Sequence, residues 1–131
     1  MVVASRHETV ALDANFVVAA LIQGTAASKQ IEAWVRSGWQ MQISAVAWSE
    51  YMCGPVEPHI ASIARRLVGI IDIFTAEDAE LAANLFNDTG RRSRSRGDCM
   101  IAAHAIRRDA VLATADAPDF RVFRKFGLRL Q

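Results

Sequence analysis

Short apolar runs alternate with longer segments of helical periodicity, and this alternation constrains the fold more than any other feature. The first run, Thr9–Leu12, has the continuous apolar character of a buried central strand. We expect further strands at Gln40–Ile43, Ile70–Phe74 and Ala110–Thr114, and a short fifth at Phe126–Leu130. The pattern predicts an α/β fold, a three-layer α/β/α sandwich around a parallel sheet of four to five strands.

Helical periodicity fills the segments between the runs. Either Asp13 or Asn15 can cap the first helix, and Ser44 can cap the third. Thr75 begins a helix with acids in its first turn, including Asp78, which suits the positive end of the helix dipole. We expect helices at Phe16–Ile22, Ala26–Arg36 and Ala45–Cys53, from Pro58 through Leu67, from Thr75 onward, and at Cys99–Arg108.

Composition favours one ordinary globular unit. The chain has 131 residues, of which 52% are hydrophobic, so we expect a single domain over residues 1–131. The net charge of +1 does not by itself indicate a nucleic-acid binder. Cys53 and Cys99 lack metal-ligand spacing, and we expect two buried thiols. Because neither a signal peptide nor a membrane span is apparent, we expect a soluble cytoplasmic protein.

Four acidic residues follow or open an apolar segment: Asp13, Glu50, Asp98 and Asp116. Open α/β sheets bind ligands beyond the carboxyl ends of their strands, so we expect these side chains to converge there. Converging carboxylates repel one another unless a cation lies between them. Hard oxygen ligands without a His or Cys cluster indicate Mg²⁺ or Mn²⁺, and hence metal-assisted phosphoryl transfer.

Each acid also has a purely structural interpretation. Asp13 can be a helix cap, Glu50 can face solvent, Asp98 can stabilise a helix dipole, and Asp116 can belong to an ordinary turn. Asp98 is the most informative of the four because it lies on the apolar stripe of its helix. A carboxylate on a packed face is less common than one on a solvated face.

Neighbouring polar residues can support the acids. Asn15 can orient a water molecule, Thr114 can hydrogen-bond a carboxylate, and Asp119 can cap the last helix or lie at the rim. The segment before Asp98 holds four arginines whose guanidinium groups suit phosphate, although such a run is often only a solvated loop. These candidate RNA-binding residues are Arg91, Arg92, Arg94 and Arg96. His104 is interpreted as a surface or core-packing residue.

Taken together, these motifs resemble a PIN domain, and specifically the toxin of a VapBC-type toxin–antitoxin pair. The resemblance covers nearly the whole chain. It implies a Mg²⁺- or Mn²⁺-dependent endoribonuclease whose metal is held by the four acids. It also implies a cognate antitoxin whose tail blocks the groove, and a homodimer. The matching segments are Leu12-Asp13-Ala14-Asn15, Ser49-Glu50, Gly97 to Ala105, Leu112 to Asp116, and Asp119-Phe120. Ala14 departs from many relatives, which have Thr or Ser there.

The expected reaction is attack of an activated water on a phosphodiester of structured RNA, leaving a 5′-phosphate. One alternative is a non-catalytic PIN-like module that binds RNA or protein, but such modules usually lose an acid and this chain has all four. The other is a receiver- or phosphatase-like α/β domain. A receiver would show a paired acid at Asp13 and a Lys after the last strand, and neither is present.

Overall fold

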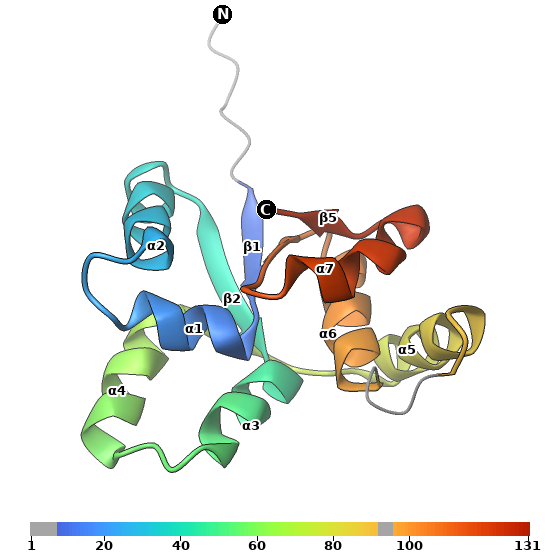
Figure 1. The fold of residues 1–131 in the computed structure, drawn as a ribbon, viewed down its shortest axis with the longest axis horizontal. Helices are drawn as coiled ribbons and strands as arrows, with labels where there is room; N and C mark the ends of the chain where they lie inside the picture. The colour runs from blue at the N-terminus through green and yellow to red at the C-terminus, as the bar shows by residue number, and fades with distance from the viewer. Residues whose placement is uncertain (1–7, 92–95) are drawn as a thin grey trace, which may run out of the picture.

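In the computed structural model, which describes residues 8–91 and 96–131, five parallel strands form one sheet (Figure 1). β1 (Thr9–Leu12) lies in the middle. On one side of it are β2 (Gln40–Ser44) and β3 (Ile70–Asp72), and on the other are β4 (Val111–Ala113) and β5 (Arg129–Leu130). The strand order changes direction between β1 and β4, and ligands of such sheets bind beside this switch point.

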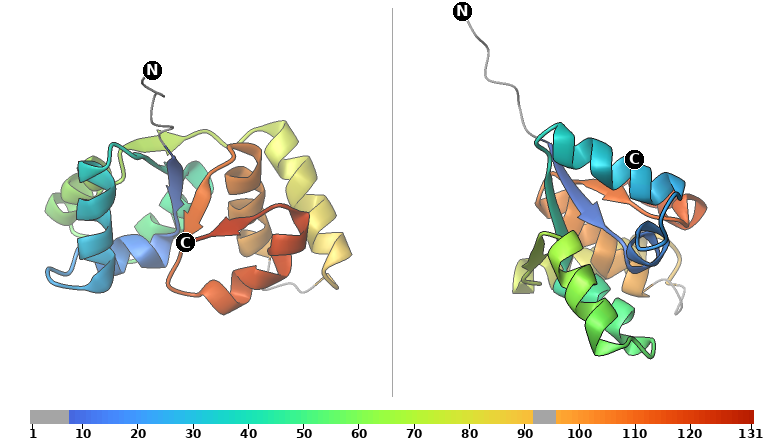
Figure 2. Two further views of the ribbon diagram at one scale, coloured as in Figure 1. Left: turned by 90° about the horizontal axis from the view of Figure 1, so that it is seen from above. Right: turned by 90° about the vertical axis from the view of Figure 1, so that its left-hand side faces the viewer.

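Helices cover both faces of the sheet, which confirms the predicted α/β/α class. Figure 2 shows α2 and α6 on opposite faces. In the described residues the helices are α1 (Ala14–Ala20), α2 (Ala26–Arg36), α3 (Ala45–Cys53), α4 (Pro58–Leu67), α5 (Ala76–Asp88), α6 (Arg96–Arg107), α7 (Ala117–Phe120) and the 3-10 helix η2 (Arg121–Phe126). None of these is long and apolar enough to cross a membrane.

Local capping signals explain most of the boundaries. Thr25 accepts a hydrogen bond from the Ser28 N–H at the start of α2, and Ser44 accepts one from the Ala47 N–H at the start of α3. The first helix was predicted to begin at Phe16, but it begins at Ala14 because Asp13 occupies the N-cap position. Asp13, which directly follows β1, therefore also caps α1.

Strand ends were predicted less well than helix starts. β3 stops at Asp72 rather than Phe74, because its partner β2 ends at Ser44 and no further pairing is available. β5 begins at Arg129 rather than Phe126, because η2 continues to Phe126 and is closed by Gly127, whose φ is 103°. β4 and α6 are also displaced from their predicted bounds by one to three residues.

The core lies on both faces of β1 and β4, where Val10, Leu12 and Leu112 are buried. The Trp34 ring stacks on Trp39, with centroids 5.7 Å apart, and packs at a tilt against Phe16, with centroids 5.8 Å apart. Cys99 is buried as expected, but Cys53 is exposed at the end of α3, which corrects that prediction.

A partly buried ion-pair network joins β3, the start of α5 and the end of α6. The Arg108 guanidinium donates to both carboxylate oxygens of Asp78, at 2.8 and 2.9 Å, and its Nε donates to Asp72 at 2.8 Å. Asp72 also contacts His104 Nε2 at 2.8 Å. Burial opposes ionisation of Asp78, but hydrogen bonds from Arg108 and from the Thr75 N–H lower its pKa to about 2. The network therefore holds a charged Asp78 in the interior.

Candidate active site

Asp13 lies at the carboxyl end of β1 and is only 5% exposed. Its Oδ1 accepts a hydrogen bond from the Ala14 N–H, and its Oδ2 accepts one from the Thr114 hydroxyl, both at 2.8 Å. Burial raises the pKa of Asp13, the two hydrogen bonds lower it, and the charge of Asp116 raises it again, with a net increase. Asp13 is therefore a helix cap whose carboxylate also interacts with the charge of Asp116.

The loop after β4 is tied to the end of β1 by side-chain hydrogen bonds. The Thr114 hydroxyl, which donates to Asp13, accepts from the Asp116 N–H at 3.0 Å. The Asn15 amide accepts from the Ala115 N–H at 3.0 Å and donates to Asp116 Oδ2 at 2.8 Å. Asn15 and Thr114 thus fix the two carboxylates of Asp13 and Asp116 relative to each other.

Asp98 lies in the first turn of α6 and points into the same region. Partial burial, followed by the negative charges of Asp13, Asp119, Glu50 and Asp116, raises its pKa to about 6. We call Asp98 and the four carboxylates whose charges raise its pKa the acidic cluster. Asp119 belongs to this cluster and does not cap α7, whose N-cap position is Asp116.

Glu50 approaches the acidic cluster from α3, across from Gly97 on α6. A Cβ atom built on Gly97 would lie 2.7 Å from Glu50 Oε1, so any larger residue would require this carboxylate to shift. Partial burial and then the charge of Asp13 raise the pKa of Glu50. The sequence interpretation had missed the role of Gly97; its signal was a glycine in the first turn of a helix, immediately before an acid.

The acidic cluster has the chemistry of a site for a hard cation. In the described parts of the chain, no ion pair joins these carboxylates to Lys or Arg. No group of three or more His, Cys, Asp or Glu side chains among the described residues is arranged to hold an ion directly. Mg²⁺ commonly keeps several water molecules and takes only one or two protein carboxylates, so the donor set suits it.

Two of the predicted arginines lie in the described part of the chain. Arg91 follows α5 and Arg96 opens α6, and both side chains are exposed. Arg92 and Arg94 lie outside the described residues. Arg96 lies in the same helical turn as Asp98, and its exposed guanidinium group is of a kind that binds phosphate.

The raised pKa of Asp98 predicts a pH-dependent cost to stability. The folded chain keeps a proton that the unfolded chain loses above 3.8, so wild-type stability should fall as pH rises towards about 6. Without a divalent cation, Asp98→Asn should raise the free energy of unfolding by about 1 kcal/mol at pH 7, after allowance for solvent screening. Urea unfolding with chelator at pH 4 and pH 7 measures this, with Glu32→Gln as the control. A gain that is equal at both pH values would contradict the prediction.

Comparison with known proteins agrees with this geometry. The family model described as PIN domain matches residues 10–125. Comparison with curated proteins gives no match. Among solved structures, VapBC-1 from nontypeable Haemophilus influenzae is similar over 94% of this chain and 96% of its own, with 21% identity and a TM-score of 0.69.

Two further solved structures show the same fold. VapBC2 from Rickettsia felis, bound to a DNA fragment from its promoter, is 19% identical over 94% of this chain and 97% of its own, with a TM-score of 0.68. A toxin–antitoxin complex from Klebsiella pneumoniae is 24% identical over 86% of this chain and 90% of its own, with a TM-score of 0.64.

Proposed function

Because this chain belongs to the PIN domain family, we propose that it is a Mg²⁺- or Mn²⁺-dependent endoribonuclease, the toxin of a type II toxin–antitoxin pair. Its substrate would be structured cellular RNA. The single observation that carries the proposal is that the charges of four other carboxylates raise the pKa of Asp98, beside the carboxyl edge of a parallel sheet. The names of the similar structures, which are toxin–antitoxin complexes, support the biological role.

In this proposal Asp13 and Asp98 hold the cation, and Glu50 and Asp116 assist directly or through water. When bound, the cation would supply Lewis-acid polarisation of the phosphate and a lowered pKa for an attacking water. The charge of the acidic cluster supports this assignment, because carboxylates that raise one another's pKa gain most from a positive partner. Asp98 would hold its proton near pH 6 and release it when positive charge enters.

The remaining residues of the site orient the ligands. The Thr114 hydroxyl holds one oxygen of Asp13, and the Ala14 N–H holds the other. Asn15 holds Asp116. These contacts leave the carboxylates few rotamers, and hydrogen bonds of this kind typically contribute ten- to a hundredfold to metal affinity or activity. Asp119 lies close enough to act on Asp98 and is proposed as a rim residue.

The arginines would contact the RNA backbone. Their positive charge would offset the repulsion between the acidic cluster and a polyanionic substrate. The four residues are Arg91, Arg92, Arg94 and Arg96. Unpaired loops of structured RNA suit such a site, because their bases can be splayed out and their backbone is accessible.

An antitoxin would cover exposed apolar side chains beside the site. Val18 and Ile22, at and just after the end of α1, are 54% and 58% exposed, and Ile60 on α4 is also exposed. Figure 1 shows α1, α3 and α4 together on the side of the sheet where β1 ends. We propose that a cognate antitoxin docks there with its tail reaching the acidic cluster, and that the toxin forms a homodimer.

The opposition of Gly97 and Glu50 gives a specific test of the site. We expect Gly97→Ala to displace the Glu50 carboxylate and to lower the cleavage rate about tenfold or more, as losses at positioned ligands do. Stability should not fall, because alanine is the better helix former. RNA cleavage and thermal unfolding would be measured in parallel. Gly54→Ala is the control, since a Cβ there meets Tyr51 O at an ordinary 3.7 Å. Equal rates for both variants would show that cleavage does not depend on the position of the Glu50 carboxylate opposite Gly97.

The function itself is tested by incubating purified protein with a pool of structured RNAs in Mg²⁺, in Mn²⁺ and in chelator. The proposal predicts cleavage only with the cations and products that carry 5′-phosphate ends. Cleavage that persists in chelator, or products ending in a cyclic phosphate, would contradict a metal-assisted attack by water. RNA that is bound but never cut would favour the alternative, a non-catalytic PIN-like module.

A further inference from the structure

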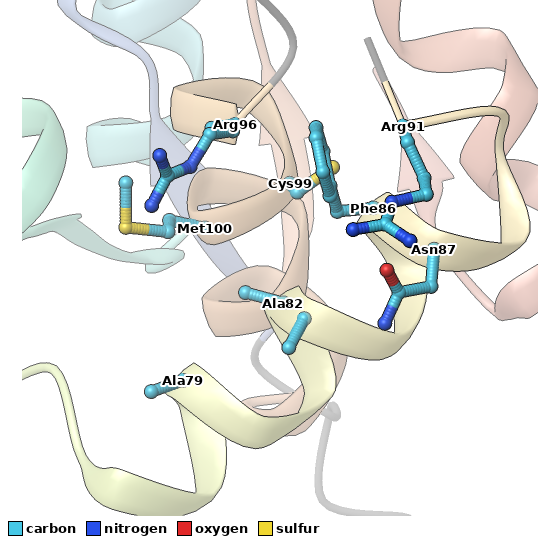
Figure 3. A pocket seen from close by; sticks show the side chains of 9 residues that line it. Ala79, Ala82, Phe86, Asn87, Arg91, Arg96, Cys99 and Met100 are labelled. Atoms are coloured by element: carbon cyan, nitrogen blue, oxygen red, sulfur yellow. The ribbon is translucent and has the colours of Figure 1, made fainter. Parts of the chain in front are cut away.

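A cavity of about 540 Å³ opens between α5 and α6, outside the acidic cluster (Figure 3). The lining is partly apolar, with small side chains and the Phe86 ring from α5 and with Cys99 and Met100 from α6, and the Phe86 ring lies beside Cys99. Among the described residues, no acidic side chain lines the cavity. Its lining residues are Ala79, Ala82, Ala83, Phe86, Asn87, Arg91, Arg96, Cys99 and Met100.

The polar lining of the cavity is cationic or amide in character. In Figure 3, Arg91 and Asn87 approach each other at one end, and Arg96 lies beside Met100 at the other. All three polar residues are exposed, so their donors are accessible from solvent. A guanidinium group binds phosphate, an amide can pair with the edge of a base, and an aromatic ring can stack on a base. This combination matches a nucleotide better than it matches a purely apolar ligand.

The backbone holds Arg91 at the rim. Arg91 has a φ of 58°, a conformation that residues other than glycine seldom adopt. Its N–H donates to Phe86 O at 2.9 Å. The arginine is therefore turned back over the end of α5, next to the ring of Phe86 (Figure 3). This local hydrogen bond fixes the backbone of Arg91, and so the origin of its side chain, at the opening of the cavity.

The cavity and the acidic cluster share the first turn of α6. Arg96, Cys99 and Met100 line the cavity, whereas Gly97 and Asp98 face Glu50 and the other acids. In a helix, these two sets of residues point to different sides of one turn. A single RNA strand that crosses the start of α6 can therefore meet both sites.

We propose that this cavity binds one unpaired nucleotide of the RNA substrate, with its base against Phe86 and its phosphate on Arg91 and Arg96. The inference rests on the proposed nuclease function and adds a place where unpaired RNA is recognised. The base enters beside Ala83 and Asn87, and the chain continues over α6 towards the acidic cluster.

Binding is tested with the four ribonucleoside 5′-monophosphates, and with ribose 5-phosphate and inorganic phosphate as probes that lack a base. In chelator, at least one nucleotide should shift the NMR signals of the Ala79 and Ala83 methyl groups and of the Asn87 side-chain amide. Ribose 5-phosphate and inorganic phosphate should leave the two methyl signals unchanged. Ala83→Phe, which places a ring at the exposed mouth, should abolish the nucleotide shifts. Asn84→Phe is the matched control, because Asn84 is exposed on the same helix and does not line the cavity.

RNA cleavage by the same variants gives the second readout. Ala83→Phe should raise KM about tenfold, the scale of losing one stacked base, with kcat unchanged, while Asn84→Phe behaves as wild type. Unaltered KM in Ala83→Phe, with wild type active, would overturn the cavity assignment and leave the nuclease intact. Nucleotide shifts in a protein that cuts no RNA would instead overturn the nuclease alone. Binding of an acidic apolar peptide, without binding of any nucleotide, would assign the cavity to a protein partner and overturn the proposal.

Discussion

Replacing Asp13 by Asn is expected to lower the rate of RNA cleavage about a thousandfold, which matches the several kcal/mol that a bound cation contributes to such a reaction. Asp13 is the most buried of the five acids, and both of its oxygens are fixed by hydrogen bonds. Asparagine keeps the shape and still accepts from the Ala14 N–H, so the fold should persist while the negative charge is lost. Single-turnover cleavage in Mg²⁺ measures the effect.

The matched control for this experiment is Asp88→Asn, which removes an exposed carboxylate outside the acidic cluster. It should cleave at the wild-type rate. Circular dichroism of both variants would establish that each is folded. If folded Asp13→Asn retained more than about a tenth of wild-type activity, Asp13 would not hold an essential cation. The catalytic site would then have to be assigned to residues other than the acid that follows β1.

Arg108→Ala should lower the free energy of unfolding by about 3–5 kcal/mol, because it leaves a buried carboxylate without its partner. Asp78 is fully buried, and Arg108 donates to both of its oxygens and to Asp72. The network lies near the end of α6 opposite Asp98. The substitution should therefore lower the free energy of unfolding without directly changing the acidic cluster. Urea unfolding at pH 7 measures it.

Arg107→Ala provides the comparison for this loss. Arg107 also contacts Asp78, but through one bond of 3.2 Å from a side chain that is 36% exposed, so its removal should cost less than about 1 kcal/mol. A similar decrease in the free energy of unfolding for the two variants would show that the bidentate contact of Arg108 contributes no more than the single contact of Arg107. A stable Arg108→Ala protein would mean that Asp78 is protonated or hydrated when Arg108 is absent.

Much of the fold was predictable because its signals are local. α2 (Ala26–Arg36) and α3 (Ala45–Cys53) begin after Thr and Ser caps and have the predicted bounds. β1 has the predicted bounds because a continuous apolar run suits the middle of a parallel sheet. Strand ends were harder, since the length of β3 depends on where β2 stops rather than on its own residues.

The parts that could not be predicted depend on residues distant in sequence. Asp78 was interpreted as an acid that suits a helix N-terminus, and the structure adds that it pairs with Arg108, thirty residues away. His104 was expected to pack at the surface or in the core, but its contact with Asp72 had no sequence signal. The Glu50 carboxylate lies 2.7 Å from where a Cβ on Gly97 would be, a contact between two helices that had no sequence signal.

Cleavage of structured RNA by wild type and by Asp98→Asn, side by side in Mg²⁺ and in chelator, tests the central claim most directly. The account predicts cutting by wild type in Mg²⁺ alone, and none by Asp98→Asn in either condition, although the variant is folded and at least as stable. Equal cutting by the two proteins in Mg²⁺ would contradict it, because the activity would then not arise from the acidic cluster.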